Sequence, residues 1–170
     1  LSIRRQRQMC IRDRSYILIM SMNINADYIQ LSTADVLKIP LPLPYNGIVY
    51  EKSSIEDFIS SAVKADKQPV LIFGGNWCPD CRILSGSLKM PTMKKYMSRN
   101  FDVMHIDVGR YEINMDLLEM FGIEKEKGVP RVLVFDKKKN LINSSTTKEW
   151  TTVRDRKQQE IFNYFQDLTL

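Results

Sequence analysis

Two cysteines, Cys78 and Cys81, are separated by two residues in the string Trp-Cys-Pro-Asp-Cys. They follow an apolar run at 70–73 and a Gly-Gly-Asn turn, and they precede a stretch with helical spacing. A thiol at the first turn of a helix lies close to unpaired backbone N–H groups, which stabilise the thiolate and lower the pKa of the thiol. We therefore expect Cys78 to be a nucleophile near neutral pH. Cys81 follows one helical turn later, where it can resolve a mixed disulfide and let the pair cycle between dithiol and disulfide.

The same cysteine spacing also occurs in zinc sites, which need further Cys or His ligands at matching spacing. The only other candidates are Cys10, in a segment that we exclude below, and His105. His105 alternates with Phe101 and Val103 in a strand-like run, which favours a hydrogen-bonded structural histidine over a catalytic one. The ligand count favours redox chemistry over zinc binding. We predict neither a metal nor an organic cofactor.

The residues around the cysteines resemble those of the thioredoxin superfamily. The resemblance rests on the strings at 75–82, 107–109 and 127–130, the last of which precedes an apolar strand at 131–135. It covers roughly residues 50–168 and is strongest toward bacterial thioredoxin-family proteins of unassigned substrate. It implies an α/β thioredoxin fold, in which a central mixed sheet is flanked by helices and preceded by an irregular N-terminal leader.

The resemblance also assigns a role to the Gly-Val-Pro string. A cis proline faces the cysteine pair in that family, and the resemblance places Pro130 in this position, since an X-Pro bond tolerates the cis form far better than other peptide bonds. Val129 would then offer backbone hydrogen bonds to an extended substrate segment. The alternative is an ordinary trans proline that opens an edge strand.

Three residues of the motif are expected to tune the site: Trp77, Pro79 and Asp80. The Asp80 carboxylate would compete with a Cys78 thiolate for the same helix terminus and raise the pKa of the thiol, which favours a reductant. The alternative is a solvated Asp80 that stabilises the helix start. Trp77 would shield the thiolate and offer a flat apolar surface to a partner, unless it is only a half-buried aromatic residue. The Pro-Asp pair between the cysteines is similar to that of small thioredoxin-related reductases.

One position departs from the family pattern. Many thioredoxins carry a buried aspartate six residues before the first cysteine, and this chain has Ile72 there. The proton of the resolving thiol must therefore go elsewhere, and water or Asp80 is the acceptor that sequence proximity suggests.

The start of the chain must be set aside before the charge is interpreted. Residues 1–14 look like translated sequencing-adapter strings, so we exclude them from fold reasoning and expect a native start near Met20 or Met22. This segment holds five arginines and one aspartate, which is +4 of the formal net charge of +5. The remainder gives no reason to expect nucleic acid or a membrane surface as a partner. The apolar stretch at 16–22 is too short to span a membrane.

The rest of the chain reads as an irregular leader at 15–49 and one α/β domain at 50–170. Alternate prolines at 40, 42 and 44 favour extended geometry, and we interpret the leader as a packed strap without a function of its own. Apolar spacing in the domain predicts helices, strands and a hairpin in this order: helix 53–63, strand 70–73, helices 79–89 and 91–100, strand 101–108, helix 114–121, hairpin 131–142 and helix 161–168. Ser53 with Glu56 predicts a capping box, Asn114 an N-cap, and Gly122 a helix stop.

We predict a thiol–disulfide oxidoreductase that acts mainly as a reductant of protein disulfides, with Cys78 as the attacking and Cys81 as the resolving cysteine. Its partners would be protein disulfide substrates and an upstream electron donor, and we expect a monomer. A cytoplasmic location is expected, with the periplasm as the alternative if a native signal peptide has been lost. The competing hypotheses are a periplasmic oxidase or isomerase, and a non-catalytic binding module that uses the surface around Trp77 and Pro130.

Overall fold

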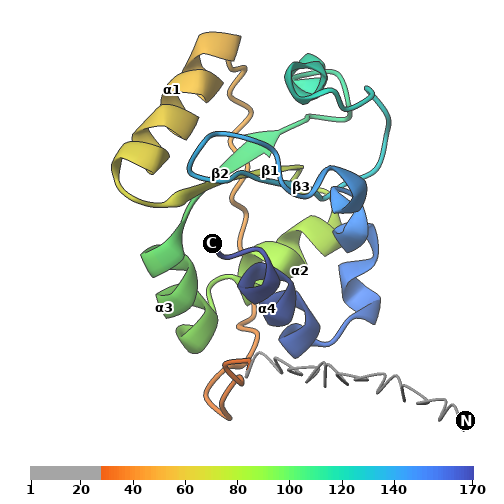
Figure 1. The fold of residues 1–170 in the computed structure, drawn as a ribbon. Helices are drawn as coiled ribbons and strands as arrows, with labels where there is room; N and C mark the ends of the chain where they lie inside the picture. Colours follow the sequence, from red (N-terminus) through yellow and green to blue (C-terminus); the bar gives the residue numbers. More distant parts are fainter. Residues whose placement is uncertain (1–27) are drawn as a thin grey trace, which may run out of the picture.

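A computed structural model describes residues 28–170, and Figure 1 shows how its helices pack around a small sheet. The predicted start of the chain near Met20 or Met22, the segment 1–14 and Cys10 lie outside the described residues. The elements in chain order are α1 (Lys52–Lys64), β1 (Gln68–Gly74), α2 (Pro79–Ser87), α3 (Pro91–Asn100), β2 (Phe101–Asp107), the 3-10 helix η1 (Met115–Phe121), β3 (Arg131–Val134), the 3-10 helices η2 (Ser144–Thr146) and η3 (Glu149–Asp155), and α4 (Gln158–Asp167).

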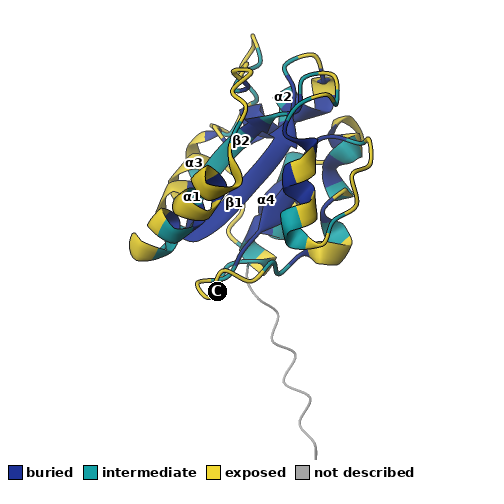
Figure 2. Ribbon diagram, turned by 90° about the horizontal axis from the view of Figure 1, so that it is seen from above, coloured by how far each residue is buried: buried dark blue, intermediate teal, exposed yellow. Residues whose placement is uncertain are grey.

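The sheet has the order β2-β1-β3, with β1 parallel to β2 and antiparallel to β3. Every residue of β1 is buried, as expected for a central strand that is covered on both faces. Figure 2 shows this strand as a continuous dark band through the molecule. The predicted mixed α/β sheet is therefore confirmed, and β1 extends beyond the predicted run at both ends.

Alternate residues of β1 point into two separate cores. Leu71 and Phe73 belong to one core, which contains residues of α1 and η1 and also both cysteines. Val70 and Ile72 belong to the other, which is filled by residues of α2, α3, η3 and α4. Figure 1 shows these two layers on opposite sides of the sheet. The period of two along a strand thus divides the interior, and it places the cysteine pair in the α1 layer.

The predicted capping box at Ser53 and Glu56 is wrong, whereas Asn114 does hold the predicted N-cap position of η1 but not through its side chain. The helix α1 begins at Lys52, with Glu51 as N-cap and no side-chain cap hydrogen bond, so Ser53 lies inside the first turn and forms no capping box. Asn114 has a left-handed backbone and does not cap η1 with its side chain. Its side-chain amide instead bonds to the backbone of Ile48, Tyr50 and Asp107, because these tertiary partners are within reach. The predicted stop at Gly122 is confirmed by its φ of 68°.

The predicted hairpin is shorter than expected. After β3, a turn with Lys139 at φ 68° leads to a single antiparallel bridge between Phe135 and Leu141. Beyond this bridge, Asn143 takes the place of a strand neighbour, because its side chain accepts from Val134 N at 2.8 Å and donates to Val132 O at 2.9 Å. The outer edge of β3 is thereby covered without a fourth strand, which satisfies backbone groups that an open edge would expose.

The described part of the leader, from Tyr28 to Val49, contains no helix or strand and packs along the domain. Tyr28 Oη donates to Asp167 Oδ1 at 2.6 Å, and the Asp35 carboxylate accepts from the backbone and hydroxyl of Thr92 at 2.7 and 2.6 Å. Figure 1 shows this orange segment passing the end of the sheet to reach α1. Near its C-terminal end the leader places Tyr45, of which only 4% is exposed, in the core that holds the cysteines.

Candidate redox site

The cysteine pair lies where β1 ends and α2 begins, and it is oxidised to a disulfide. Cys78 is the N-cap of α2, and its Sγ accepts a hydrogen bond from Cys81 N at 3.1 Å. Pro79 takes the first helical position, where its fixed φ suits a helix and its missing N–H costs no hydrogen bond. The α2 terminus thus offers its positive end to Cys78, as the spacing predicts.

The Val129–Pro130 bond is cis, which confirms the geometry that the resemblance implied for Pro130. The loop faces the disulfide, since Cys78 Sγ lies 3.7 Å from the carbonyl oxygen of Val129. Gly128 adopts a φ of 129°, a backbone conformation that a residue with a side chain rarely takes, and so the chain can turn sharply into this loop. Cys78, Cys81, Val129 and Pro130, which are far apart in the sequence, are therefore brought together.

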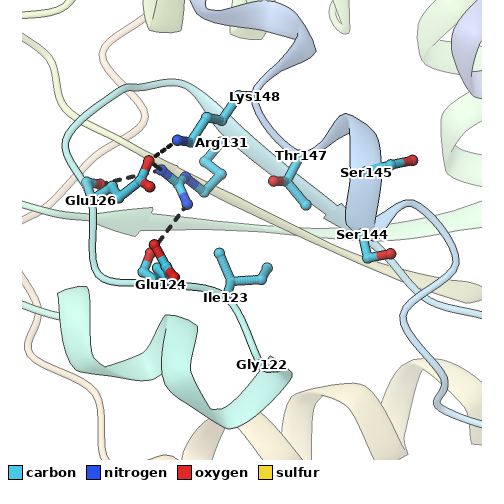
Figure 3. A pocket seen from close by; sticks show the side chains of 9 residues that line it. All are labelled: Gly122, Ile123, Glu124, Glu126, Arg131, Ser144, Ser145, Thr147 and Lys148. Atoms are coloured by element: carbon cyan, nitrogen blue, oxygen red, sulfur yellow. Dashed lines mark hydrogen bonds and ion pairs between the residues drawn. The ribbon is translucent and has the colours of Figure 1, made fainter.

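A cavity of about 320 Å³ lies beside this loop, at the start of β3 (Figure 3). The side chain of Arg131, which is only 1% exposed, donates to the carbonyl oxygens of Glu124 at 3.4 Å and Glu126 at 3.2 Å. Glu126 forms an ion pair with Lys148 across the same cavity. These contacts tie the segment before Val129 to the sheet and to the segment before η3, and they hold the proline loop in place.

We call Trp77 and the loop at Val129 and Pro130 the outer side of the site. Trp77 is 36% exposed. Its indole N–H donates to the carbonyl oxygen of Gly109, and its ring packs edge-on against Tyr111 at 5.5 Å. The guanidinium of Arg110 lies 5.0 Å from the ring centroid, in the arrangement of a cation–π pair. Trp77 thus presents a held aromatic surface beside Cys78, flanked by a cation.

Asp80 is not solvated, so that alternative is wrong: the residue is 2% exposed. Its carboxylate accepts from Arg154 N at 2.9 Å and forms an ion pair with the guanidinium of Arg154. These bonds join the first turn of α2 to η3, two elements that are distant in the sequence. Burial of a carboxylate requires such partners, because an unpaired charge in the interior is costly. Asp80 therefore brings a cation with it to the helix terminus.

We call Tyr45 and Asn76 the inner side of the site, and neither residue belongs to the Trp-Cys-Pro-Asp-Cys string. Ile72, the position that departs from the family pattern, is fully buried in the other core and not in the one that holds the cysteines. Tyr45, from the leader, lies in the core beside the cysteines. Asn76 clamps the backbone of Tyr45, accepting from Tyr45 N at 3.2 Å and donating to Tyr45 O at 2.7 Å.

His105 is a hydrogen-bonded structural residue, as predicted. Its Nε2 lies 3.0 Å from Ser85 Oγ, and its ring packs edge-on against Tyr45 at 5.4 Å. Burial lowers the pKa of His105 to about 4, with a smaller contribution in the same direction from Lys89. The imidazole is therefore neutral at pH 7, and it forms part of the wall behind Tyr45.

Sequence reasoning did not find Tyr45, Asn76 or Arg154. Asn76 belongs to the string that carries the resemblance, but its contact with the leader had no local signal. Tyr45 follows the alternate prolines, and nothing in its neighbours indicates burial. Arg154 lies in a charged run that is typical of a solvated face.

Within residues 28–170, no group of three or more His, Cys, Asp or Glu side chains is arranged to hold a metal ion. In the same part of the chain, each helix is too short or too polar to cross a bilayer.

Comparison with known proteins agrees with this geometry. The family model described as thioredoxin matches residues 45–150. No curated protein matches the chain. Among solved structures, a disulphide isomerase from Xylella fastidiosa Temecula1 is 28% identical, with a TM-score of 0.67 over 75% of this chain and 97% of that one. A mutant thioredoxin from Halobacterium salinarum NRC-1 is 17% identical, with a TM-score of 0.48 over 83% of this chain and 97% of that one.

The family match covers more than half of the chain and includes the cysteine pair, the cis proline and Tyr45. The chain therefore belongs to the thioredoxin family and is a thioredoxin-like thiol–disulfide oxidoreductase.

Proposed function

We propose that this protein is a reductant of protein disulfides in which Cys78 attacks and Cys81 resolves. One observation carries the proposal: Cys78 caps α2 with its sulfur beside the Val129 carbonyl and is 4% exposed, while Cys81, one turn further into α2, has no exposed surface. The helix terminus stabilises a thiolate at Cys78. A buried sulfur at Cys81 is reached only by a partner that is already bonded to Cys78.

The reaction has two exchange steps. The Cys78 thiolate attacks one sulfur of the substrate disulfide, a mixed disulfide forms, and the departing substrate thiolate takes a proton from water. Cys81 then loses its proton and attacks Cys78 Sγ, which breaks the mixed disulfide and releases the second substrate thiol. Two electrons pass from the cysteine pair to the substrate, and an upstream dithiol donor must return them.

The loop at Val129 and Pro130 is suited to hold the substrate. An extended peptide can pair with the backbone of Val129 as a short added strand. Trp77 supplies a neighbouring aromatic surface, which explains why a protein segment would bind better than a small disulfide.

Asp80 supports the reducing direction. A carboxylate in the first turn of α2 opposes a thiolate at the same terminus, so it destabilises the reduced form relative to the disulfide. The Arg154 guanidinium offsets part of this charge. A reductant acts where thiols are kept reduced, so the proposal includes a cytoplasmic location.

Isomerisation is the second candidate, because the Xylella fastidiosa structure with 28% identity is described as a disulphide isomerase. The reduction potential separates the two. We expect a reduction potential of about −270 mV for a reductant, whereas a potential between about −180 and −120 mV would favour an isomerase or oxidase.

The potential is measured by equilibrating the full chain in glutathione or dithiothreitol buffers. Turnover of insulin disulfides is measured alongside it. A Cys78→Ser variant that binds insulin as well as the wild type, together with a wild type that does not turn over, would instead support the non-catalytic binding module.

A further inference from the structure

Tyr45 carries a buried hydroxyl that, in the oxidised protein, has no hydrogen-bond partner within residues 28–170. The residue is 4% exposed, and burial raises the pKa of Tyr45 above its usual value, so the hydroxyl keeps its proton. The Ser85 hydroxyl is near enough to oppose this shift in part, but it does not satisfy Tyr45 Oη at hydrogen-bond geometry. Leaving a buried hydroxyl without a hydrogen-bond partner costs free energy, so a state in which this hydroxyl donates to an acceptor is favoured.

Cys81 Sγ lies near this hydroxyl and changes its bonding during the reaction. A Cβ placed on Gly74 would lie 2.3 Å from Tyr45 Oη and 2.9 Å from Cys81 Sγ. The two atoms are thus separated by no more than the sum of these distances, and they lie on the same side of Gly74. Gly74 is the last residue of β1, and a side chain at this position would stand between the hydroxyl and the sulfur.

Tyr45 is held in this place from two directions. The side-chain amide of Asn76, two residues before Cys78, makes two hydrogen bonds to the Tyr45 backbone. The ring lies edge-on against His105, which is itself tied to Ser85. A side chain held at both its backbone and its ring is preorganised, and it loses little entropy when it forms a new bond.

The ionisable groups around the pair come from several elements. Asp107, at the end of β2, bears on Tyr45 and raises its pKa further. His105, also on β2, is neutral at pH 7, and Lys89 beyond α2 acts on it. Asp80 on α2 is paired with Arg154 of η3. A thiolate at Cys81 thus forms in a buried setting in which Tyr45 is a neutral donor at close range.

We propose that Tyr45 donates a hydrogen bond to the Cys81 thiolate once the disulfide is open, and thereby promotes the resolving step. This inference rests on the proposed function, since it assigns Cys81 the second attack. In that step the Cys81 thiol gives its proton to water, the thiolate attacks Cys78 Sγ, and the substrate sulfur leaves and takes up a proton from water. Tyr45 loses no proton, and it stabilises the charge that Cys81 carries before it attacks.

The leader is then more than a strap. It places a side chain in the core that holds Cys81, and Asn76 links the motif to that side chain.

The test uses 5,5′-dithiobis(2-nitrobenzoate) mixed with the reduced full chain. The first release of thionitrobenzoate reports the attack of Cys78 and depends on reagent concentration. The second release reports the attack of Cys81 on the mixed disulfide and does not depend on it. The two rates are followed from pH 5 to pH 10 in the wild type and in Tyr45→Phe, which keeps the ring and removes only the hydroxyl. Tyr50→Phe is the matched control, because Tyr50 packs against the same core.

For Tyr45→Phe we expect a second phase slowed about tenfold at pH 7 and a pH midpoint raised by about one unit, since one unit corresponds to tenfold in thiolate population. The first phase should stay within about twofold, and Tyr50→Phe should match the wild type in both phases. An unchanged rate and midpoint of the second phase in Tyr45→Phe would overturn the inference. If Cys78→Ser keeps the first phase, the proposed function itself fails, so the two failures are distinct.

A second variant protects the test against misfolding. Asn76→Ala removes the clamp on the Tyr45 backbone but leaves the hydroxyl present, and it should raise the midpoint by less than Tyr45→Phe does. If Tyr45→Phe does not fold, an unshifted midpoint in Asn76→Ala would overturn the inference.

Discussion

The outer and inner sides of the disulfide are built on different principles. The outer side consists of Trp77, whose ring is partly exposed, and the loop at Val129 and Pro130, whose Val129 carbonyl lies beside Cys78 Sγ. The inner side consists of Tyr45, which is buried in the core that holds Cys81, and Asn76, whose side chain holds the Tyr45 backbone. The outer side is suited to recognising an extended protein segment, whereas the inner side is suited to setting the properties of one sulfur. The motif distinguishes the two cysteines by their position in the helix, and their surroundings distinguish them further.

The inner side should make folding depend on pH. His105 is buried neutral, with a pKa of about 4 against about 6.5 in the unfolded chain. Between these values the unfolded chain binds the proton more readily, so stability falls as pH falls from about 6.5 toward 4. We expect a loss of about 2 kcal/mol between pH 7 and pH 5, measured by urea unfolding.

In His105→Gln this pH-dependent loss should shrink to the part that carboxylates contribute. If stability falls by the same amount between pH 7 and pH 5 in the variant and the wild type, His105 is not buried as a neutral imidazole.

The outer and inner sides also differ in how far sequence could predict them. The cysteine pair and the main helices and strands follow from local strings and apolar spacing, and the cis proline follows from the family resemblance. The 3-10 helices η2 and η3 were not predicted, and η1 was expected as an ordinary helix. The partners of Asn114 and Asp80 could not be predicted, because each side chain bonds to a segment that is distant in sequence. Asp80 and Asn114 both have the local appearance of helix caps, and tertiary partners outweigh that preference.

The outer side should contribute more to the binding of protein substrates than to the reaction of small disulfides. Trp77→Ala removes an aromatic surface beside Cys78, and we expect KM for insulin to rise about tenfold, as is typical when an aromatic residue that a partner covers is truncated. The rate with a small aromatic disulfide should stay within about threefold. Equal losses with both substrates would show that Trp77 acts on Cys78 itself. Tyr111→Ala, which removes the ring that packs against Trp77, should give a smaller rise in KM.

The smallest expected effect concerns the ion pair between Asp80 and Arg154. Asp80→Asn removes a negative charge from the first turn of α2 and should raise the reduction potential by about 6 to 20 mV, given about 0.3 to 1 kcal/mol for a charge at a helix end. Arg154→Gln should move the potential in the opposite direction, because it leaves the Asp80 charge unbalanced. Potentials of the double variant close to the wild type would support a purely electrostatic effect. A fall in Asp80→Asn would show that the pair acts by positioning α2.

The order of attack is the central claim, and trapping of mixed disulfides tests it most directly. Cys81→Ser and Cys78→Ser variants of the full chain are incubated with oxidised insulin or a cell extract, and covalent adducts are counted by non-reducing electrophoresis and mass spectrometry. We predict that Cys81→Ser accumulates adducts through Cys78, while Cys78→Ser forms few or none, because Cys81 is fully buried behind Cys78. Equal trapping by both variants, or trapping by Cys78→Ser alone, would contradict the account.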